Sequence, residues 1–320
     1  MITRSGTFRV PRILPGTAAI PEVMLVLDSF TSITRALEWA VSRLKQQGIE
    51  YPRLDAEVLL AHCMNSDRVC LYRNRAVPLE MGCQQRFRNY INRRAAWEPV
   101  AYITGKKEFR SLAFKVSPRV LIPRPETETI IEVMLHLYGK LRGITRTVQL
   151  LEVGTGSGII AVSLAHELER TWVCATDYAP SILEVAQANA QLNRVDHKIS
   201  FLAGNLFDCL VGRGGANLFD CIISNPPYLS DDEWMTAQPE IREFEPEIAF
   251  RAGPDGLSFY RLLVPEAGRL LNRNGYVLLE IGVGQSAPVA QLIGDTGVFG
   301  PVVTAKDLSG TDRVVIAQKR

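Results

Sequence analysis

At 320 residues with 47% hydrophobic residues, the chain is long enough to form two domains with substantial cores. Its net charge of +2 produces no overall field that would select a polyanion or a membrane surface. The six cysteines form no Cys-x-x-Cys pair, the four histidines lack metal-ligand spacing, and no apolar run approaches the ~18 residues of a membrane span. We therefore expect a cytoplasmic protein with free buried thiols, no metal site and no membrane contact.

The first third of the chain predicts an extension followed by a small helical domain. Residues 1–28 begin with an Arg-rich, nearly acid-free stretch, which is typical of a disordered extension, with a transit peptide as the weaker alternative. Apolar residues at helical spacing predict an amphipathic helix over 31–47, and further helices fit 54–60 and about 79–96. We assign residues 29–97 to an all-helical substrate-recognition domain.

A linker and a larger domain follow. Apolar residues among glycine and turn residues over 98–125 predict a β-hairpin linker that closes at several prolines. From 126 to 320, helical and strand patterns alternate, which predicts a mostly parallel sheet with helices on both faces and ligands at the carboxyl ends of the strands. The expected helices cover 127–142, a segment after Gly158, 180–193 and 257–273. The expected strands cover 147–153, 171–176, 198–202, 219–224, 276–281, 299–304 and 312–317.

The most informative motif is Ser-Asn-Pro-Pro-Tyr at 224–228, because it ends an apolar run that reads as a buried strand. Two consecutive prolines donate no backbone hydrogen bonds and stop a strand abruptly. The resulting corner suits a planar NH2 group: Asn225 and the carbonyl of Pro226 can accept its two protons while Tyr228 stacks on its face. Such acceptors return electron density to a poorly nucleophilic amide nitrogen and stabilise the positive charge that grows on it. No general base is therefore expected.

A second motif, Glu-Val-Gly-Thr-Gly-Ser-Gly at 152–158, forms a glycine turn after another apolar strand. Its third glycine is Gly158, whereas a dinucleotide fingerprint would want glycine at Ile159, so the spacing favours S-adenosylmethionine (SAM). Glu152 could engage the methionine ammonium directly or through water. Asp177 ends the next strand, where a carboxylate can chelate a ribose diol. Together the two motifs predict a methyltransferase that acts on a planar nitrogen.

Charge is distributed unevenly along the chain. Residues 86–124 contain ten Lys/Arg and two Glu, whereas 225–256 contain eight acidic and two basic residues. Two ordinary solvated faces are the simplest interpretation. The acidic run nevertheless directly follows the predicted target corner, which matters for the choice of substrate.

In this order of motifs the chain resembles the release-factor glutamine methyltransferases, the PrmC/HemK family, from about residue 30 onward. Beside the two motifs, the resemblance rests on 98–105, 121–128, 244–246 and 255–257, and 124–128 separates the chain from the related ribosomal-protein glutamine methyltransferases. The family implies an α/β fold: a seven-stranded Rossmann-like class I methyltransferase sheet, with a small all-helical N-terminal domain and a β-hairpin linker.

The resemblance also implies a substrate, the glutamine of the Gly-Gly-Gln loop in a class 1 peptide-chain release factor. Asn205-Leu206 and Arg110 depart from the family pattern, on the adenine side and in the linker respectively. The residues expected to bind SAM are Glu152, Gly154, Thr155, Gly156, Ser157, Gly158, Asp177, Leu206 and Asn225. The residues expected to hold the substrate glutamine are Asn225, Pro226, Pro227 and Tyr228, with Asn225, Pro226 and Tyr228 serving the transfer itself.

Two alternatives to this function remain open from the residues. An adenine-N6 methyltransferase of DNA or RNA could use the same corner on a flipped base, but it should line its target entrance with Lys/Arg rather than with acidic residues. A non-catalytic SAM-binding translation module would have no use for an NH2 clamp. We therefore expect a protein substrate and no direct nucleic-acid substrate.

Overall fold

The computed structural model describes residues 30–141, 146–210 and 216–320. The chain divides into two compact units, Met1–Ile91 and Asn92–Arg320. The extension predicted over 1–28 lies outside the described residues. This division rests on compactness alone, so the functional domain boundaries drawn from the sequence stay predictions.

The first unit is helical, as the sequence predicts. Helix α2 begins after Ser32, whose hydroxyl accepts a hydrogen bond from the backbone N–H of Arg35, an N-cap that satisfies an otherwise unpaired donor. Its apolar face packs Trp39 beside the rings of Phe30 and Phe87. The helices are α2 (Ile33–Gln46), α3 (Pro52–Cys63), α4 (Arg68–Arg73) and α5 (Met81–Ala95), whose last turn belongs to the second unit; α4 was not predicted.

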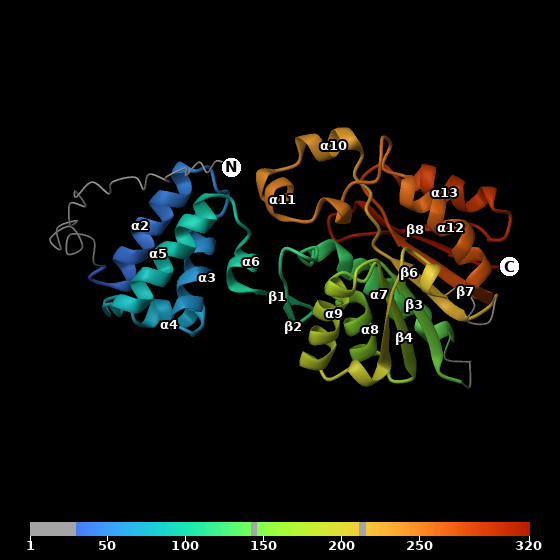
Figure 1. Ribbon diagram of the computed structural model, residues 1–320, viewed down its shortest axis with the longest axis horizontal. Coiled ribbons are helices and arrows are strands. Elements are labelled where there is room, and N and C mark those ends of the chain that lie inside the picture. The colour runs from blue at the N-terminus through green and yellow to red at the C-terminus, as the bar shows by residue number, and fades with distance from the viewer. Residues whose placement is uncertain (1–29, 142–145, 211–215) are drawn as a thin grey trace, which may run out of the picture. The chain divides into compact units, whose positions relative to one another are not determined.

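The second unit is built on a seven-stranded sheet in the order β5-β4-β3-β6-β7-β9-β8 (Figure 1). The strands β3 to β7 run parallel, and β9 and β8 are added antiparallel at one edge. The order reverses between β3 and β6, which makes the carboxyl ends of these two strands the expected ligand crevice. The strands are β3 (Val148–Val153), β4 (Thr171–Asp177), β5 (Ile199–Ala203), β6 (Phe219–Ser224), β7 (Leu271–Glu280), β8 (Val303–Lys306) and β9 (Asp312–Gln318).

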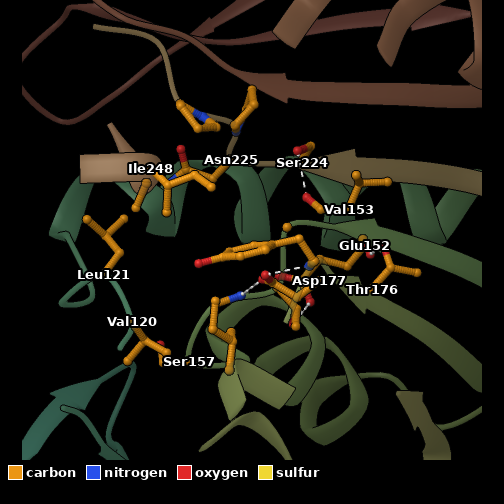
Figure 2. Close-up of a pocket in the computed structure, with 18 of the residues that line it drawn as sticks. Val120, Leu121, Glu152, Val153, Ser157, Thr176, Asp177, Ser224, Asn225 and Ile248 are labelled. Carbon is orange, nitrogen blue, oxygen red and sulfur yellow. Dashed lines mark hydrogen bonds between the residues drawn. The ribbon is translucent and has the colours of Figure 1, made fainter. Parts of the chain in front are cut away.

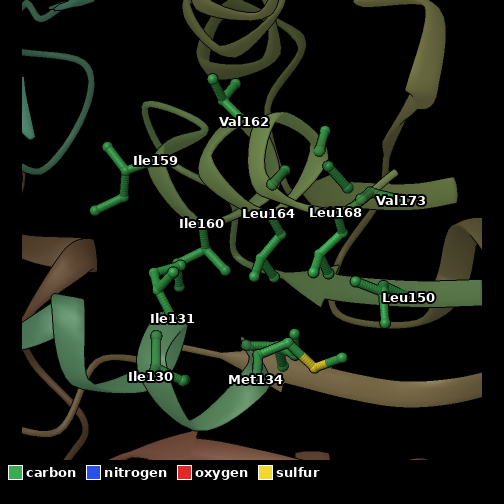
Figure 3. Close-up of a cluster of buried hydrophobic side chains, with 14 of the residues drawn as sticks. Ile130, Ile131, Met134, Leu150, Ile159, Ile160, Val162, Leu164, Leu168 and Val173 are labelled. Atoms are coloured by element: carbon green, nitrogen blue, oxygen red, sulfur yellow. The ribbon is translucent and has the colours of Figure 1, made fainter. Parts of the chain in front are cut away.

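Helices cover both faces of this sheet because successive strand residues point to opposite sides. On one face Leu150 joins a buried cluster with helices α7 and α8, and Figure 3 shows Ile131 and Met134 of α7 against α8. On the other face Leu151 packs with α12 and α13. The helices around the sheet are α7 (Glu128–Leu141), α8 (Ile159–Glu167), α9 (Pro180–Leu192), α10 (Asp231–Thr236), α11 (Pro239–Phe244), α12 (Ser258–Leu270) and α13 (Ser286–Asp295).

The predicted β-hairpin of the linker is present as strands β1 (Lys106–Phe109) and β2 (Leu112–Lys115), which follow the short helix α6 (Val100–Thr104). Its turn places both Arg110 and Ser111 at positive φ, as a two-residue turn of type I′ requires. The guanidinium of Arg110 pairs with Glu132 of α7 and Glu167 of α8. Arg110, the departure from the family pattern, thus ties the hairpin to the helices that cover the sheet.

Several elements differ from the sequence predictions. Strand β7 begins at Leu271 rather than at 276, because Leu271 already pairs with Phe219 of β6. The polar residues between Leu271 and Tyr276 form a bulge in the strand. Helix α13 was missed, since Pro288 stands inside its first turn, and the short helices α10 and α11 were missed as well. Strand β8 lies at Val303–Lys306 instead of 299–304.

Candidate functional site

A largely apolar cavity opens at the carboxyl ends of β3, β4 and β6, where the strand order reverses (Figure 2). It contains about 1090 Å³ of space between protein atoms, part of which is open to solvent. The linker contributes part of its wall through Val120 and Leu121, and the segment after α11 contributes Ile248. The predicted site residues that line it are Glu152, Gly154, Thr155, Gly156, Ser157, Asp177, Leu206, Asn225, Pro226 and Pro227.

The glycine turn follows β3 and requires glycine at three positions. Gly154, Gly156 and Gly158 all have positive φ, a conformation that side chains disfavour. A Cβ added to Gly154 or Gly156 would meet no protein atom within 4 Å, whereas one added to Gly158 would lie 3.1 Å from the Cβ of Ala186. The first two glycines therefore leave an open cradle toward a ligand, and Gly158 permits close packing of α8 on α9.

Glu152, near the end of β3, stabilises this turn through hydrogen bonds. Its Oε2 accepts hydrogen bonds from the Thr155 hydroxyl at 2.7 Å and from the Ala161 backbone N–H at 3.0 Å, in the first turn of α8. Only 2% of Glu152 is exposed, and burial raises the pKa of its carboxyl to about 8, against the two hydrogen bonds that lower it. Two carboxylates with raised pKa values, Glu152 and Asp177, thus share one cavity.

Asp177, the last residue of β4, lines the cavity beside the glycine turn. Its Oδ2 accepts from the Gly156 backbone N–H at 2.9 Å and its Oδ1 from that of Tyr178 at 2.8 Å, while burial raises the pKa of the carboxyl. Tyr178, half exposed at the cavity, is a lining residue that the sequence analysis missed. Leu206 lines the same side with a positive φ of 49°, an uncommon conformation for a branched residue.

The proline corner lies beside the glycine turn because β6 and β3 are neighbours. The Ser224 hydroxyl donates to the carbonyl of Val153 at 2.7 Å, which joins the two motifs directly. Asn225 lines the cavity, and its Nδ2 donates to the hydroxyl of Thr127 at 3.2 Å. Figure 2 shows Asn225 on the wall across the cavity from Asp177.

Tyr228 is placed differently from its neighbours in the motif, since it does not belong to the cavity lining. Its backbone carbonyl accepts from Gln285 Nε2 at 2.8 Å, and its ring lies close to Gly282. Burial raises the pKa of its hydroxyl to about 12, so this group stays protonated at neutral pH. The geometry therefore brings Asn225 and Pro226 together with the glycine turn and leaves Tyr228 at the edge of the corner.

The basic and acidic runs of the sequence partly neutralise each other. Arg94 pairs with Glu240 at 2.8 Å, and Arg124 pairs with Glu245, whose other oxygen accepts from the backbone N–H of Ile122. These pairs anchor the last turn of α5 and the linker to the segment that follows the proline corner. A run of charge in the sequence is thus not equivalent to a free charged surface.

Two buried residues behind the corner were not anticipated. Thr127 is fully buried in the turn η1 (Pro125–Thr127), and Glu280, the last residue of β7, is 1% exposed. Glu280 is 55 residues beyond Asn225 in sequence, so no local spacing signals it. Strand register does: Ser224 pairs with Leu279, which places Asn225 and Glu280 at adjacent strand ends.

A mostly parallel sheet with helices on both faces, a glycine turn after β3 and a ligand cavity at the point of reversal define a Rossmann-like methyltransferase domain. Comparison with known proteins agrees with this class. The family described as methyltransferase small domain matches residues 135–241, and the PrmC N-terminal domain family matches residues 35–105. The hMettl16 catalytic domain, solved in complex with MAT2A 3'UTR hairpin 6, superposes with a TM-score of 0.51 at 18% identity, covering 70% of this chain and 81% of that one.

Curated relatives extend the match to nearly the whole chain. The release factor glutamine methyltransferase of Geobacter sulfurreducens is 40% identical over 284 residues, which cover 89% of this chain and 95% of the relative. That of Moorella thermoacetica is 39% identical over 289 residues, covering 90% and 99%. The chain belongs to the release factor glutamine methyltransferase family. Among the described residues, no helix is both long and apolar enough to cross a membrane.

Proposed function

We propose that this protein transfers a methyl group from SAM to the side-chain amide nitrogen of the glutamine in the Gly-Gly-Gln loop of a class 1 peptide-chain release factor. The observation that carries the proposal is the contact between the two motifs, with Asn225 on the wall of a cavity whose floor is the glycine turn. The names of the curated relatives support the same reaction. Neither observation favours the adenine-N6 alternative.

The residues around the cavity fit SAM by shape and by the hydrogen-bond acceptors that they offer. The open space over Gly154 and Gly156 suits the methionine portion. The methionine ammonium would bind the Glu152 carboxyl, whose Oε2 also accepts a hydrogen bond from Thr155 in the glycine turn. Asp177 would accept from the ribose hydroxyls, as a carboxylate at the end of a second strand does in related folds. Leu206 and the ring of Tyr178 would flank the adenine. When bound, SAM supplies an electrophilic methyl group on a sulfonium.

In the proposed reaction the corner orients the target amide. The side-chain oxygen of Asn225 and the carbonyl of Pro226 accept the two N–H protons, which aims the nitrogen lone pair into the cavity and stabilises the charge that develops on it. No base needs to act before transfer, because the spare proton can leave afterwards. The ring of Tyr228 is proposed to pack on the amide from the edge of the corner.

The helical unit is the proposed recognition surface for the folded release factor. It exposes several large apolar side chains, and such residues often mark protein contacts. Binding energy from a surface remote from the glutamine can be used to orient it. Since release factors act in translation, we place the reaction in the cytoplasm. The exposed apolar residues are Tyr51, Leu54, Val69, Tyr72, Val77 and Met81.

Labelled SAM tests the proposal directly. We expect label from methyl-labelled SAM to enter a class 1 release factor, and to be lost when the loop glutamine is replaced by alanine. A ribosomal protein and DNA, incubated in parallel, should stay unlabelled. The Asn225→Ala variant should lose turnover by ~100-fold or more and lose far less SAM affinity, because the lost acceptor serves the transition state. Label in DNA, or in the glutamine-free factor, would contradict the proposed substrate.

A further inference from the structure

Thr127 and Glu280 form a buried polar pair directly behind the target corner, and the reaction proposed above does not use them. The Nδ2 of Asn225 donates to Thr127 Oγ1 at 3.2 Å. Glu280 lies at the strand end beside Asn225, and both the Thr127 hydroxyl and the Asn225 amide interact with its carboxyl and lower its pKa. The other carboxyl oxygen of Glu280, Oε2, is buried without a hydrogen-bond partner among the described residues. Side chains from η1, from the corner after β6 and from the end of β7 therefore lie together.

The donors and acceptors of these groups determine which way the Asn225 amide is oriented. An ionised carboxylate only accepts hydrogen bonds, so it draws the single proton of the Thr127 hydroxyl. The hydroxyl oxygen then presents lone pairs to Asn225. Both neighbours of the Asn225 amide are consequently acceptors, and an amide placed against two acceptors must offer them its NH2 group. Its oxygen is left to face the cavity.

We propose that Glu280 and Thr127 are positioning residues that lock the Asn225 amide with its oxygen toward the target glutamine. This inference rests on the proposed function, in which that oxygen accepts a proton of the substrate amide. A flipped Asn225 would present its NH2 to the substrate NH2, donor against donor, and the corner would lose half of its acceptors. Unlike Asn225, the pair touches neither SAM nor substrate and acts through Asn225 alone.

The pair also gives a physical role to the stretch 124–128, which the sequence analysis singled out as selective for the family. Thr127 supplies the hydroxyl behind Asn225, and Arg124 binds Glu245. One short turn thus connects the corner to β7 and to the segment that follows α11. Replacing it would disturb Asn225 without altering the motif that contains Asn225.

The surroundings of Glu280 make the lock dependent on pH. Burial, helped by the charge of Glu126 in η1, raises the pKa of its carboxyl to about 7, against Thr127, Arg313 of β9 and Asn225, which lower it. Tyr228 and Tyr260 are the other titratable neighbours, and both keep their protons at neutral pH because their pKa values are raised. Above pH 7 the carboxylate accepts only. Below pH 7 a protonated Glu280 can donate to the Asn225 oxygen, and the amide is free to flip.

The test compares Glu280→Gln, Thr127→Val and Thr127→Ser in the full-length protein. Glutamine can donate as well as accept, so Glu280→Gln should lower kcat about tenfold at pH 8, as loss of an orienting partner does for metal ligands. SAM affinity should stay within twofold. Thr127→Val should behave alike, and Thr127→Ser, which keeps the hydroxyl, should restore most of the turnover. The matched control is Asp220→Asn, a buried carboxylate at the opposite end of β6, which should leave kcat per folded molecule unchanged.

A pH profile separates this role from a merely structural one. At saturating SAM, kcat of the wild type should rise with pH through an apparent pKa near 7, and Glu280→Gln should be flat over that range. Glu152 also titrates in the cavity, with a pKa of about 8, but on the cofactor side, so its effect belongs to SAM affinity. Equal slopes in wild type and Glu280→Gln would overturn the inference, as would turnover in Thr127→Val equal to that of the wild type.

A readout without activity distinguishes failure of the lock from failure of the proposed function. The side-chain ¹⁵N–H signals of Asn225 should shift with an apparent pKa near 7 in the wild type and not in Glu280→Gln. If the release factor is not methylated but the Asn225 signals titrate as expected, the substrate assignment fails and the lock stands. If the signals do not move between pH 6 and 8, the lock is wrong whatever the enzyme methylates.

Discussion

Replacing Asn189 by alanine should lower the free energy of unfolding by about 3 kcal/mol, although this residue touches no expected ligand. Asn189 is fully buried in α9 and uses its whole amide. Its Oδ1 accepts from the Lys115 backbone N–H at 2.7 Å, and its Nδ2 donates to the carbonyls of Lys115 at 2.9 Å and Ser157 at 2.8 Å. One side chain thereby holds both the linker hairpin and the glycine turn.

The magnitude follows from these three hydrogen bonds. Each contributes about 1 kcal/mol, and the carbonyl of the buried Ser157 would be left unpaired away from water. Asn189→Asp should cost at least as much, because it directs a carboxylate at two carbonyl oxygens. Since Ser157 belongs to the glycine turn, SAM affinity should fall in both variants as well.

Denaturant unfolding measures the effect, with the shift of the midpoint converted through the slope. The matched control is Asn193→Ala at the C-cap of the same helix, where a half-buried amide donates to the carbonyls of Ala113 in the same hairpin and of Asn189, both at 2.9 Å. This control should cost less, about 1–2 kcal/mol, because it loses two hydrogen bonds and its site is open to water. A loss below 1 kcal/mol for Asn189→Ala, or equal losses for both variants, would refute the reasoning.

Three further variants probe the cavity and the corner. Asp177→Ala should weaken SAM binding by about 2–3 kcal/mol in calorimetry, since it removes ribose acceptors and the partner of the Gly156 backbone N–H; unchanged affinity in a folded variant would count against the assignment. Gly158→Ala should destabilise the fold by about 1–2 kcal/mol through its positive φ and its crowding against α9, measured by thermal unfolding, while Gly139→Ala in α7, with open space around it, should be neutral or stabilising. Tyr228→Phe should reduce turnover less than Tyr228→Ala if the ring is what acts, and equal losses in the methylation assay would return the role to the hydroxyl.

The sequence predicted the sheet and its cavity because each depends on local signals. Apolar runs, glycine spacing and two prolines are all visible within a few residues, and parallel strands bring their ends together at one edge. The pairing of Asn225 with Thr127 and Glu280 could not be predicted in this way, since it depends on the strand register and on the path of the linker. Helix α13 was missed because proline usually breaks a helix. Pro288 is tolerated here since it stands in the first turn, where its backbone nitrogen would have no partner within the helix.

The charged runs give the same lesson in another form. Ten basic residues in one segment indicate a cationic surface only if their charges are not paired with acidic residues. Arg94 and Arg124 are paired in this way with residues of the acidic segment. Side-chain pairing over more than a hundred residues of sequence is a property of the fold. Charge along the sequence can therefore indicate a candidate binding surface. Only the three-dimensional structure shows how many of its charges are unpaired and can contact a partner.

The hydrogen bond from Ser224 to Val153 joins the ends of two adjacent parallel strands, whose separation is set by the backbone at about 4.8 Å. If SAM binds at one strand end and the amide at the next, the approach of donor and acceptor is determined by main-chain pairing and not by flexible side chains. Methyl transfer would then tolerate wide exchange of the surrounding helices and linker, provided that this pairing is kept. New targets could be acquired by changing what delivers the amide, while the spacing at which the reaction occurs stays constant.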